Sequence, residues 1–389
     1  MKKENLKKGI SVLLILMMSL FLLTGCGNSN EDEKVYVTKE GDLTIELDNA
    51  LSFSEGLAPV CKDDKWGYID QTGAVVIDYQ FEGAAPFSDG MALVMKNDKT
   101  GFIDKAGNIV IACKYDNAGE EGFQNGVARV YLDKEWGVIN KAGEIVVPFG
   151  KYYKIKEFQN GFAQVESETA RDYTSKTGYI DVEGNEIVEM DLDNLGLQYF
   201  SEGLAVKSNA KYNSTLDTIS NRKYGYVDEN LNMVIEQKYK KAGSFSEGLA
   251  PVSEDGEKIG YIDKEGNLVI DYQFHNAMGF SEGYAVVNNG EKCGVIDKQG
   301  NLVVDYKYDY IMPFSEGLAA FVPDLSVDAD EQKVGYINTK GEVIVEPIYD
   351  AKAFVSKGFG NFSEGLALVC KDGKFGYVNY DGKIIIGNI

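Results

Sequence analysis

Few side chains in this sequence have the types and the spacing that catalysis requires. The chain contains one histidine, His275, which excludes zinc sites built on paired histidines. Residues 279–283, GFSEG, match the G-x-S-x-G motif that exposes a nucleophilic serine between a strand and a helix. The same serine slot recurs without the first glycine at Ser54, Ser88, Ser201, Ser246, Ser315 and Ser363. We therefore interpret the match as a coincidence of a repeated segment and predict that the protein is not an enzyme, with hydrolase activity as a remote alternative.

The carboxylates form two patterns that could bind cations. Asp191, Asp193 and Glu202 stand at offsets of a calcium-binding loop, but Leu195 occupies a position that needs an oxygen ligand. Aspartates also recur at one slot of the repeat, namely at Asp70, Asp104, Asp181, Asp228, Asp263 and Asp297. An aspartate there can accept backbone N–H bonds within a turn, and we prefer this explanation to a ladder of weak divalent-cation sites. The sequence thus predicts no metal and no cofactor.

The N-terminal residues have the composition of a processing segment. Lysines at positions 2, 3, 7 and 8 precede an apolar run over residues 10–23, which is shorter than the roughly 20 residues that span a bilayer as a helix. The tetrapeptide LTGC at residues 23–26 resembles the bacterial lipobox, in which the cysteine is lipidated and becomes the new N-terminus. We predict a signal peptide over residues 1–25, a lipid anchor on Cys26 followed by a polar tether to residue 34, and a location on the extracytoplasmic face of the cell membrane. An ordinary secretory signal is the alternative.

From residue 35 to residue 389 the chain repeats one unit, which residues 53–84 represent. Three segments of this unit have the composition of strands, at residues 57–61, 66–70 and 74–81. An opening phenylalanine recurs at Phe53, Phe87, Phe123, Phe158, Phe200, Phe245, Phe280, Phe314 and Phe362. A glycine in the middle strand recurs at Gly67, Gly101, Gly137, Gly178, Gly225, Gly260, Gly294, Gly335 and Gly376. A turn glycine follows six residues later at Gly73, Gly107, Gly143, Gly184, Gly266, Gly300, Gly341 and Gly382, with Leu231 as the exception.

The middle strand carries a resemblance to a known family. The segments KWGYID at residues 65–70 and EWGVIN at residues 135–140 resemble the bacterial WG-repeat family, and the resemblance extends over nearly the whole mature chain. Only Trp66 and Trp136 keep the tryptophan, which is replaced by Thr100, Thr177, Tyr224, Ile259, Cys293, Val334 and Phe375. The resemblance implies a β repeat and says little about activity, since the family is known mainly as a repeat of unassigned role.

The predicted fold is all-β, a tandem array of about nine three-stranded antiparallel meanders in an open solenoid or superhelical stack. The chain begins on a half repeat of two strands, and its end lacks no strand that this half would complete, which argues against a closed ring. A β-propeller is the alternative, but it needs about four strands in 40 to 45 residues per blade. The regular copies here are only 34 to 36 residues long.

Two features of the repeat could form binding surfaces. Polar insertions lengthen the first hairpin at residues 167–176, 207–223 and 323–333, and they predict either a binding face or tolerated loop growth. An aromatic residue also follows the middle-strand glycine, and this set comprises Tyr68, Phe102, Tyr179, Tyr226, Tyr261, Tyr336 and Tyr377. Buried between copies, these side chains would form the core; exposed, they would form a stacking surface for sugar rings or a peptide.

The formal net charge of −22 disfavours nucleic acid, because binding to a phosphate backbone depends on basic contacts. We therefore expect a membrane-anchored scaffold that binds another envelope or secreted protein. Binding of cell-wall polysaccharide through the aromatic stripe is the alternative.

Overall fold

The computed structural model describes residues 35–38, 44–167, 176–191, 196–209, 222–351 and 360–387, which form 37 strands. The predicted signal peptide and tether, including Cys26, lie outside the described residues. Within those residues we find no helix with the length and apolar character that crossing a bilayer requires.

The strands form consecutive antiparallel sheets, which we number as blades. A short N-terminal hairpin comprises β1 (Val35–Thr38) and β2 (Thr44–Leu47). Blades 1 to 3 comprise β3 (Asn49–Ala50), β4 (Leu57–Lys62), β5 (Lys65–Asp70), β6 (Val75–Phe81); β7 (Gly83–Ala84), β8 (Ala92–Lys96), β9 (Lys99–Ile103), β10 (Ile109–Tyr115); and β11 (Asn117–Ala118), β12 (Val127–Leu132), β13 (Glu135–Asn140), β14 (Ile145–Val147). Blades 4 to 6 comprise β15 (Lys154–Gln159), β16 (Phe162–Glu166), β17 (Thr177–Asp181), β18 (Glu186–Asp191); β19 (Leu197–Ser201), β20 (Leu204–Ser208), β21 (Tyr224–Val227), β22 (Met233–Tyr239); and β23 (Lys241–Ala242), β24 (Ala250–Ser253), β25 (Ile259–Ile262), β26 (Leu268–Phe274). Blades 7 to 9 comprise β27 (Asn276–Ala277), β28 (Tyr284–Asn288), β29 (Cys293–Asp297), β30 (Leu302–Tyr308); β31 (Tyr310–Ile311), β32 (Leu318–Val322), β33 (Lys333–Asn338), β34 (Val343–Asp350); and β35 (Leu366–Lys371), β36 (Lys374–Asn379), β37 (Ile384–Ile386).

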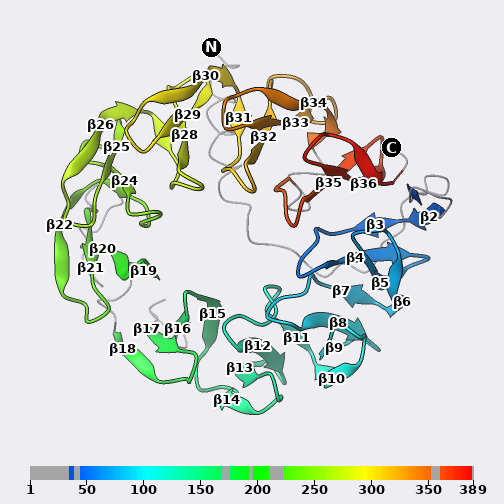
Figure 1. Ribbon diagram of the computed structural model, residues 1–389. Helices are drawn as coiled ribbons and strands as arrows, with labels where there is room; N and C mark the ends of the chain where they lie inside the picture. The colour runs from blue at the N-terminus through cyan, green and yellow to red at the C-terminus, as the bar shows by residue number, and fades with distance from the viewer. Residues whose placement is uncertain are drawn as a thin grey trace.

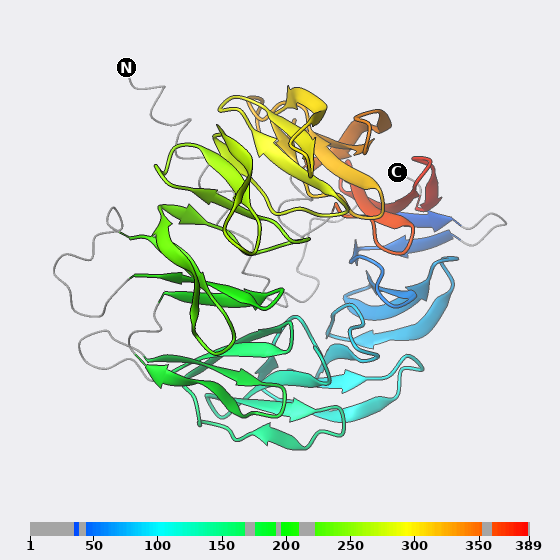
Figure 2. The same cartoon turned by 60° about the vertical axis from the view of Figure 1, so that its left-hand side comes forward.

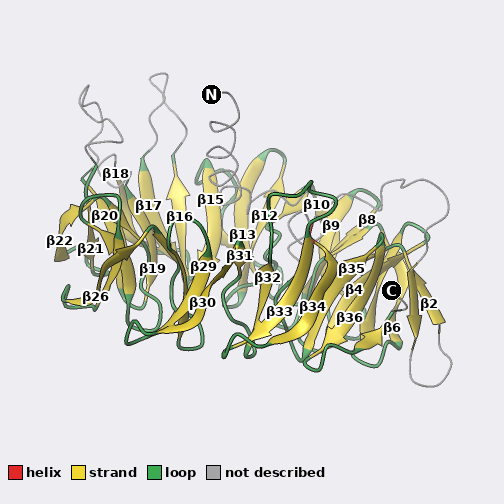
Figure 3. Cartoon of the chain, turned by 90° about the horizontal axis from the view of Figure 1, so that it is seen from above, coloured by secondary structure: helices red, strands yellow, loops and turns green. Residues whose placement is uncertain are grey.

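The blades close into a nine-bladed β-propeller (Figure 1). Eight blades have four strands, and blade 9 has three within the described residues. The last strand of a blade lies at the rim of the ring, as β18 and β22 show, while first strands such as β15 and β19 lie nearer its centre (Figure 1). Viewed from above, the strands run between the two faces of the ring, so hairpin turns line both faces (Figure 3).

The prediction of an open solenoid of three-stranded meanders is therefore wrong. The three predicted strands of the representative unit are present as β4, β5 and β6. The missing fourth strand is only two residues long in most blades, and it directly follows the last strand of the preceding blade. Gly83 and Ala84, for example, pair with Met95 and Val94 of β8. Because this strand is so short, four strands fit into a copy of about 35 residues.

The N-terminal hairpin completes the ring. The expectation that the end of the chain lacks no strand that this hairpin would complete is therefore wrong. Outer strand β37 has three residues, whereas β6 has seven. Strand β1 contacts both β36 and β37, and the N-terminal hairpin lies beside the C-terminal blade (Figure 2). Leu47 is fully buried in the same core cluster as Ile386 and Tyr377 of blade 9. The two ends of the chain therefore share the last seam of the propeller.

Candidate functional site

The aromatic residues considered for binding all lie in the core. The seven side chains are fully buried, namely Tyr68, Phe102, Tyr179, Tyr226, Tyr261, Tyr336 and Tyr377. Tyr68 packs against Phe87 of the next copy with ring centroids 5.0 Å apart, and its hydroxyl donates to the carbonyl oxygen of Ala85 at 2.9 Å. Burial raises the pKa of the Tyr68 phenol. These residues join successive blades and present no exposed stacking surface.

The repeat glycines serve two structural purposes. A Cβ at Gly67 or at Gly260 would lie 2.5 Å from the carbonyl oxygen of Ile77 or Ile270, so the middle strand approaches the outer strand too closely for a side chain. The glycines Gly137 and Gly376 occupy the same slot in their blades. The turn glycines have positive φ angles, 79° at Gly73, 78° at Gly143, 85° at Gly266 and 73° at Gly382, which an L side chain rarely adopts.

The motif residues are also used within the fold. The hydroxyl of Ser281 donates to the carbonyl oxygen of Phe314 in the next blade at 2.9 Å, as the hydroxyl of Ser54 does to Phe87 at 2.6 Å. His275 is exposed beside the Nζ atom of Lys258. The carboxylate of Glu202 accepts a hydrogen bond from the backbone of blade 6. None of these residues assembles a nucleophile with a base.

The turn aspartates form the predicted turns. The Oδ1 atom of Asp104 accepts hydrogen bonds from the backbone N–H groups of Ala106 and Asn108, at 3.0 and 2.9 Å. The side-chain amide of Asn108 donates to Oδ2 at 3.0 Å, and this bond, together with the backbone bonds, lowers the pKa of Asp104. Among the described residues no group of acidic, cysteine or histidine side chains is arranged to hold a metal ion.

Blades 3 to 5 depart from the rest of the ring at two slots of the repeat, one before and one after the opening phenylalanine. Two residues before the opening phenylalanine, six copies carry an apolar residue or glycine, but blades 3, 4 and 5 carry Glu121, Lys156 and Gln198. Six residues after the opening phenylalanine, seven copies carry an aliphatic residue or proline, but blades 3 and 4 carry Arg129 and Gln164. The five polar residues are consecutive around the ring, so they form one polar sector.

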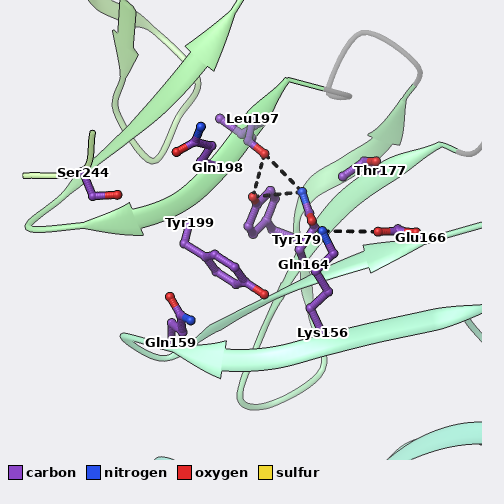
Figure 4. Close-up of a pocket in the computed structure, with 10 residues that line it drawn as sticks. All are labelled: Lys156, Gln159, Gln164, Glu166, Thr177, Tyr179, Leu197, Gln198, Tyr199 and Ser244. Carbon is purple, nitrogen blue, oxygen red and sulfur yellow. Dashed lines mark hydrogen bonds and ion pairs between the residues drawn. The ribbon is translucent and has the colours of Figure 1, made fainter. Parts of the chain in front are cut away.

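A cavity of about 510 Å³ lies in this sector, at the seam between blades 4 and 5 (Figure 4). Its lining comprises Lys156, Gln159, Gln164, Glu166, Thr177 and Tyr179 from blade 4, Leu197, Gln198 and Tyr199 from blade 5, and Ser244 beside blade 6. The lining therefore combines three side-chain amides with hydroxyl groups and one ion pair. It is suited to hydrogen bonding with a polar ligand.

Gln164 is the buried polar residue of the cavity. Its side chain is 6% exposed, and its amide nitrogen donates to the hydroxyl of Tyr179 at 3.2 Å and to the carbonyl oxygen of Leu197 at 3.1 Å. The hydroxyl of Tyr179 donates to the same carbonyl at 3.1 Å. Gln164 thus spans the seam between the two blades.

Charged groups surround the cavity in pairs. Lys156 lies 3.4 Å from the Oε1 atom of Glu166. Arg129 makes a bidentate ion pair with Glu121, at 2.6 and 2.7 Å, and also donates to the carbonyl oxygen of Ile155 in blade 4 at 2.7 Å. The guanidinium also lies 5.3 Å from the ring centroid of Trp136.

The pKa of the Tyr199 phenol depends on its burial and on the charged groups around it. Burial raises its pKa, and Glu157 raises it further, while Arg129 acts in the opposite direction. Glu121 and Glu166 also raise this pKa. Together the three carboxylates therefore change the pKa of this phenol more than the guanidinium does.

Blades 3 and 4 lack an acidic clamp that joins each of the other blades to the next. Glu55 accepts a hydrogen bond from the N–H group of Gly90 and an ion pair from Lys105, both at 3.1 Å and both from blade 2. Equivalent bonds to the backbone of the next blade are made by Asp89, Glu202, Glu247, Glu282, Glu316 and Glu364. In blades 3 and 4 this slot holds Asn125 and Asn160, and Asn160 donates instead to the carbonyl oxygen of Phe200 at 2.9 Å. The cavity thus lies at a seam without the acidic clamp.

The sequence contains a signal for this site in the differences between the copies. Aligned on the opening phenylalanine, the copies show polar residues in apolar slots at Glu121, Arg129, Lys156, Gln164 and Gln198. The aromatic residues that the copies share belong to the core, whereas the cavity is lined by residues at positions where the copies differ. The insertions at residues 167–176 and 207–223 lie largely outside the described residues, and the loop at 323–333 is folded back, with Leu325 donating its N–H to Asp309 at 2.8 Å.

The fold resembles that of other proteins of low sequence identity. A eukaryotic initiation factor superposes with a TM-score of 0.52 at 10% identity, over 80% of this chain and 95% of that chain. BamB from Moraxella catarrhalis gives a TM-score of 0.37 at 9% identity over 91% of this chain and 100% of that chain. The first likeness shows the fold alone. No curated protein matches this chain.

The model of the WG containing repeat matches nine segments, at residues 36–66, 66–99, 101–136, 136–168, 178–212, 224–257, 259–293, 294–322 and 335–375. These segments cover most of the chain and include both tryptophans of the middle strand. The chain belongs to the WG containing repeat family.

Proposed function

We propose that this protein is a lipid-anchored scaffold on the extracytoplasmic face of a bacterial cell membrane, and that it binds another envelope or secreted protein at the cavity between blades 4 and 5. The observation that carries the proposal is the polar sector. In a ring of nine similar blades, only the consecutive blades 3, 4 and 5 carry a polar side chain in a slot that is otherwise apolar or glycine. These side chains are Glu121, Lys156 and Gln198. Blades 4 and 5 also have the longest first strands of the ring, β15 and β19, so the departure from the repeat is local, and we take it to point to a ligand.

The anchor rests on the lipobox at residues 23–26 and the preceding apolar run. Lipidation of Cys26 would hold the ring at the membrane surface, and a polar tether of a few residues would leave it free to meet a partner. Metabolic labelling with an alkynyl fatty acid tests this part. Label on the wild-type protein and its loss in Cys26→Ser would support it, whereas label in neither would contradict it.

Binding suits the cavity better than catalysis does. A hydrolytic site would bring two carboxylates together, but Glu166 is the single carboxylate in the lining, and it is paired with Lys156. The buried aromatic set leaves no exposed stripe for a polysaccharide.

Capture from solubilised envelope tests the protein-binding proposal. The full chain, carrying a C-terminal affinity tag, is compared with the double variant Gln198→Ala and Tyr199→Ala. The matched control replaces by alanine Gln299 and Tyr306 of blade 7, which are exposed and half-buried, respectively, as Gln198 and Tyr199 are. We expect the wild-type protein and the control to capture the same partner in stoichiometric amount, and the cavity variant to lose it.

Equal capture by the cavity variant and the control would contradict the proposal. Retention on purified cell wall, competed by sugar and without a protein partner, would assign the protein to the glycan-binding class instead.

A further inference from the structure

Gln164 brings an unpaired acceptor to the cavity. Its side chain is more than nine-tenths buried, and both of its hydrogen bonds are made by the amide nitrogen. Among the described residues, no group donates to its amide oxygen. The amide oxygen is not one of the buried atoms that lack a partner, so it is open to the cavity, where a ligand that donates a hydrogen bond can reach it.

Other acceptors surround this oxygen. The carboxylate of Glu166 and the hydroxyl oxygens of Tyr199 and Ser244 line the same cavity. Lys156 is the one cation in the lining, and Glu166 already pairs with it at 3.4 Å. Gln164 and Glu166 therefore offer acceptors to a ligand that carries N–H donors.

The charge balance points in the same direction. Glu121 is neutralised by Arg129, and Glu166 by Lys156, at the distances given above. Glu157 is exposed next to Lys156, and within the described part of the chain its carboxylate pairs with no cation; it accepts a hydrogen bond from the side chain of Gln159. Burial is the main cause of the raised pKa of Tyr199, and Glu157 is the charged group that raises this pKa most, so its carboxylate acts on the cavity wall. The whole chain carries a net charge of −22, which also attracts cations.

The cavity has the size and the aromatic surface for a basic side chain. Its volume of about 510 Å³ is within the range of small-ligand sites, about 300–1,000 Å³. It can hold one long side chain together with flanking peptide backbone. The ring of Tyr199 is half-buried in the cavity wall, so a cation in the cavity can lie over the face of the ring (Figure 4).

We infer that the cavity between blades 4 and 5 binds an arginine side chain from an extended segment of the partner protein. This inference rests on the proposed function and specifies the chemistry that the site recognises. Arginine suits the site better than lysine, because its planar guanidinium has five donors in fixed directions and stacks on aromatic rings. The amide oxygen of Gln164 and the carboxylate of Glu166 supply acceptors in the lining, and the exposed carboxylate of Glu157 adds negative charge near Tyr199.

Fluorescence anisotropy with a labelled peptide tests the inference. The probe is Gly-Ser-Arg-Ser-Gly with blocked ends, and the matched probe replaces arginine by citrulline, which has nearly the same shape without the charge. We expect the full chain to bind the arginine peptide at least about tenfold more tightly than the citrulline peptide, since hydrogen bonds to charged groups are roughly twice as strong as neutral ones.

Two variants locate the binding. Gln164→Leu should abolish the preference for arginine, because it removes the amide oxygen. Glu157→Gln changes an exposed side chain that the fold does not need, and it should weaken the arginine peptide about threefold or more. Its matched control is Glu265→Gln, an exposed glutamate in the turn of blade 6. Unchanged affinity in Glu157→Gln, or an equal loss in the control, would overturn the inference.

The outcomes separate this inference from the proposed function. If the two peptides bind equally while the cavity variant still loses its envelope partner, the arginine inference fails and the protein-binding proposal stands. If N,N′-diacetylchitobiose displaces the arginine peptide and no partner protein is captured, both fail and the site belongs to the glycan-binding class.

Discussion

The phenol oxygen of Tyr261 shows how a single atom joins two blades. The hydroxyl donates to the carbonyl oxygen of Met278 in the next copy at 2.7 Å, and the ring packs against Phe280 with centroids 5.0 Å apart. Tyr226 and Tyr377 make the same bond, to Gly243 at 2.8 Å and to Leu51 at 2.6 Å. Tyr336 occupies the same slot, but its buried hydroxyl has no hydrogen-bond partner within the described residues.

This difference gives a prediction within one slot. Tyr261→Phe should lower the free energy of unfolding by about 1–2 kcal/mol, because it leaves a buried carbonyl oxygen without its donor. Tyr336→Phe should change that free energy by less than about 0.5 kcal/mol or raise it, because it removes a hydroxyl that already lacks a partner. Urea denaturation of both variants measures the difference. Equal losses would show that the inter-blade hydrogen bond contributes nothing to stability.

At the scale of the strand, the structure explains why the middle-strand glycine is kept while the tryptophan is not. The tryptophan slot is buried in most blades, and the pocket accepts side chains as different as Thr100, Val334 and Phe375. The glycine slot faces the backbone of the outer strand, where even a Cβ has no room. A packed pocket can adjust to a new side chain, but a backbone contact at van der Waals distance cannot.

Gly260→Ala tests this explanation. The new Cβ would lie 2.5 Å from the carbonyl oxygen of Ile270, so the outer strand must move, and we expect a loss of about 2–4 kcal/mol in the free energy of unfolding. The matched control is Gly248→Ala, which has a positive φ of 87° but open space around the Cβ. It should cost about 1 kcal/mol, from backbone strain alone. A control that costs as much as Gly260→Ala would contradict the proposed close approach.

The strands and the turns could be predicted from the sequence, because their causes are local. Alternating β-branched and aromatic residues located β5 and β6, and the turn aspartates behave as their chemistry requires. The two-residue strands were missed, because so short a segment has no periodicity. The middle-strand aromatic residues share one slot of the repeat, but the sequence alone left open whether that slot is buried, and the structure places it in the core.

At the scale of the whole molecule, the ring depends on contacts that no local pattern reveals. Gly56 in blade 1 donates its N–H to Glu364 in blade 9 at 2.8 Å, across 308 residues of sequence. The same acidic clamp links most neighbouring blades, so the last seam resembles the others. An open array would have left Glu364 and Leu47 without these partners.

Leu47→Ala tests closure of the ring. The side chain is fully buried between the first and last blades, so its truncation should cost about 2–5 kcal/mol and lower the midpoint of a single unfolding transition. Val327→Ala, at an exposed site, is the control and should leave the midpoint unchanged. Fraying of one terminal repeat, seen as hydrogen exchange there with an unchanged global midpoint, would instead indicate an open stack.

The central claim is that the polar sector of blades 3 to 5 is the binding surface, and site-specific photocrosslinking in intact cells tests it most directly. A photoreactive amino acid replaces Gln198, which lines the cavity, or Met278, which occupies the same slot in blade 7. We predict a crosslinked protein adduct from position 198 and none from position 278. Adducts of equal yield from both positions, or an adduct from position 278 alone, would contradict the account.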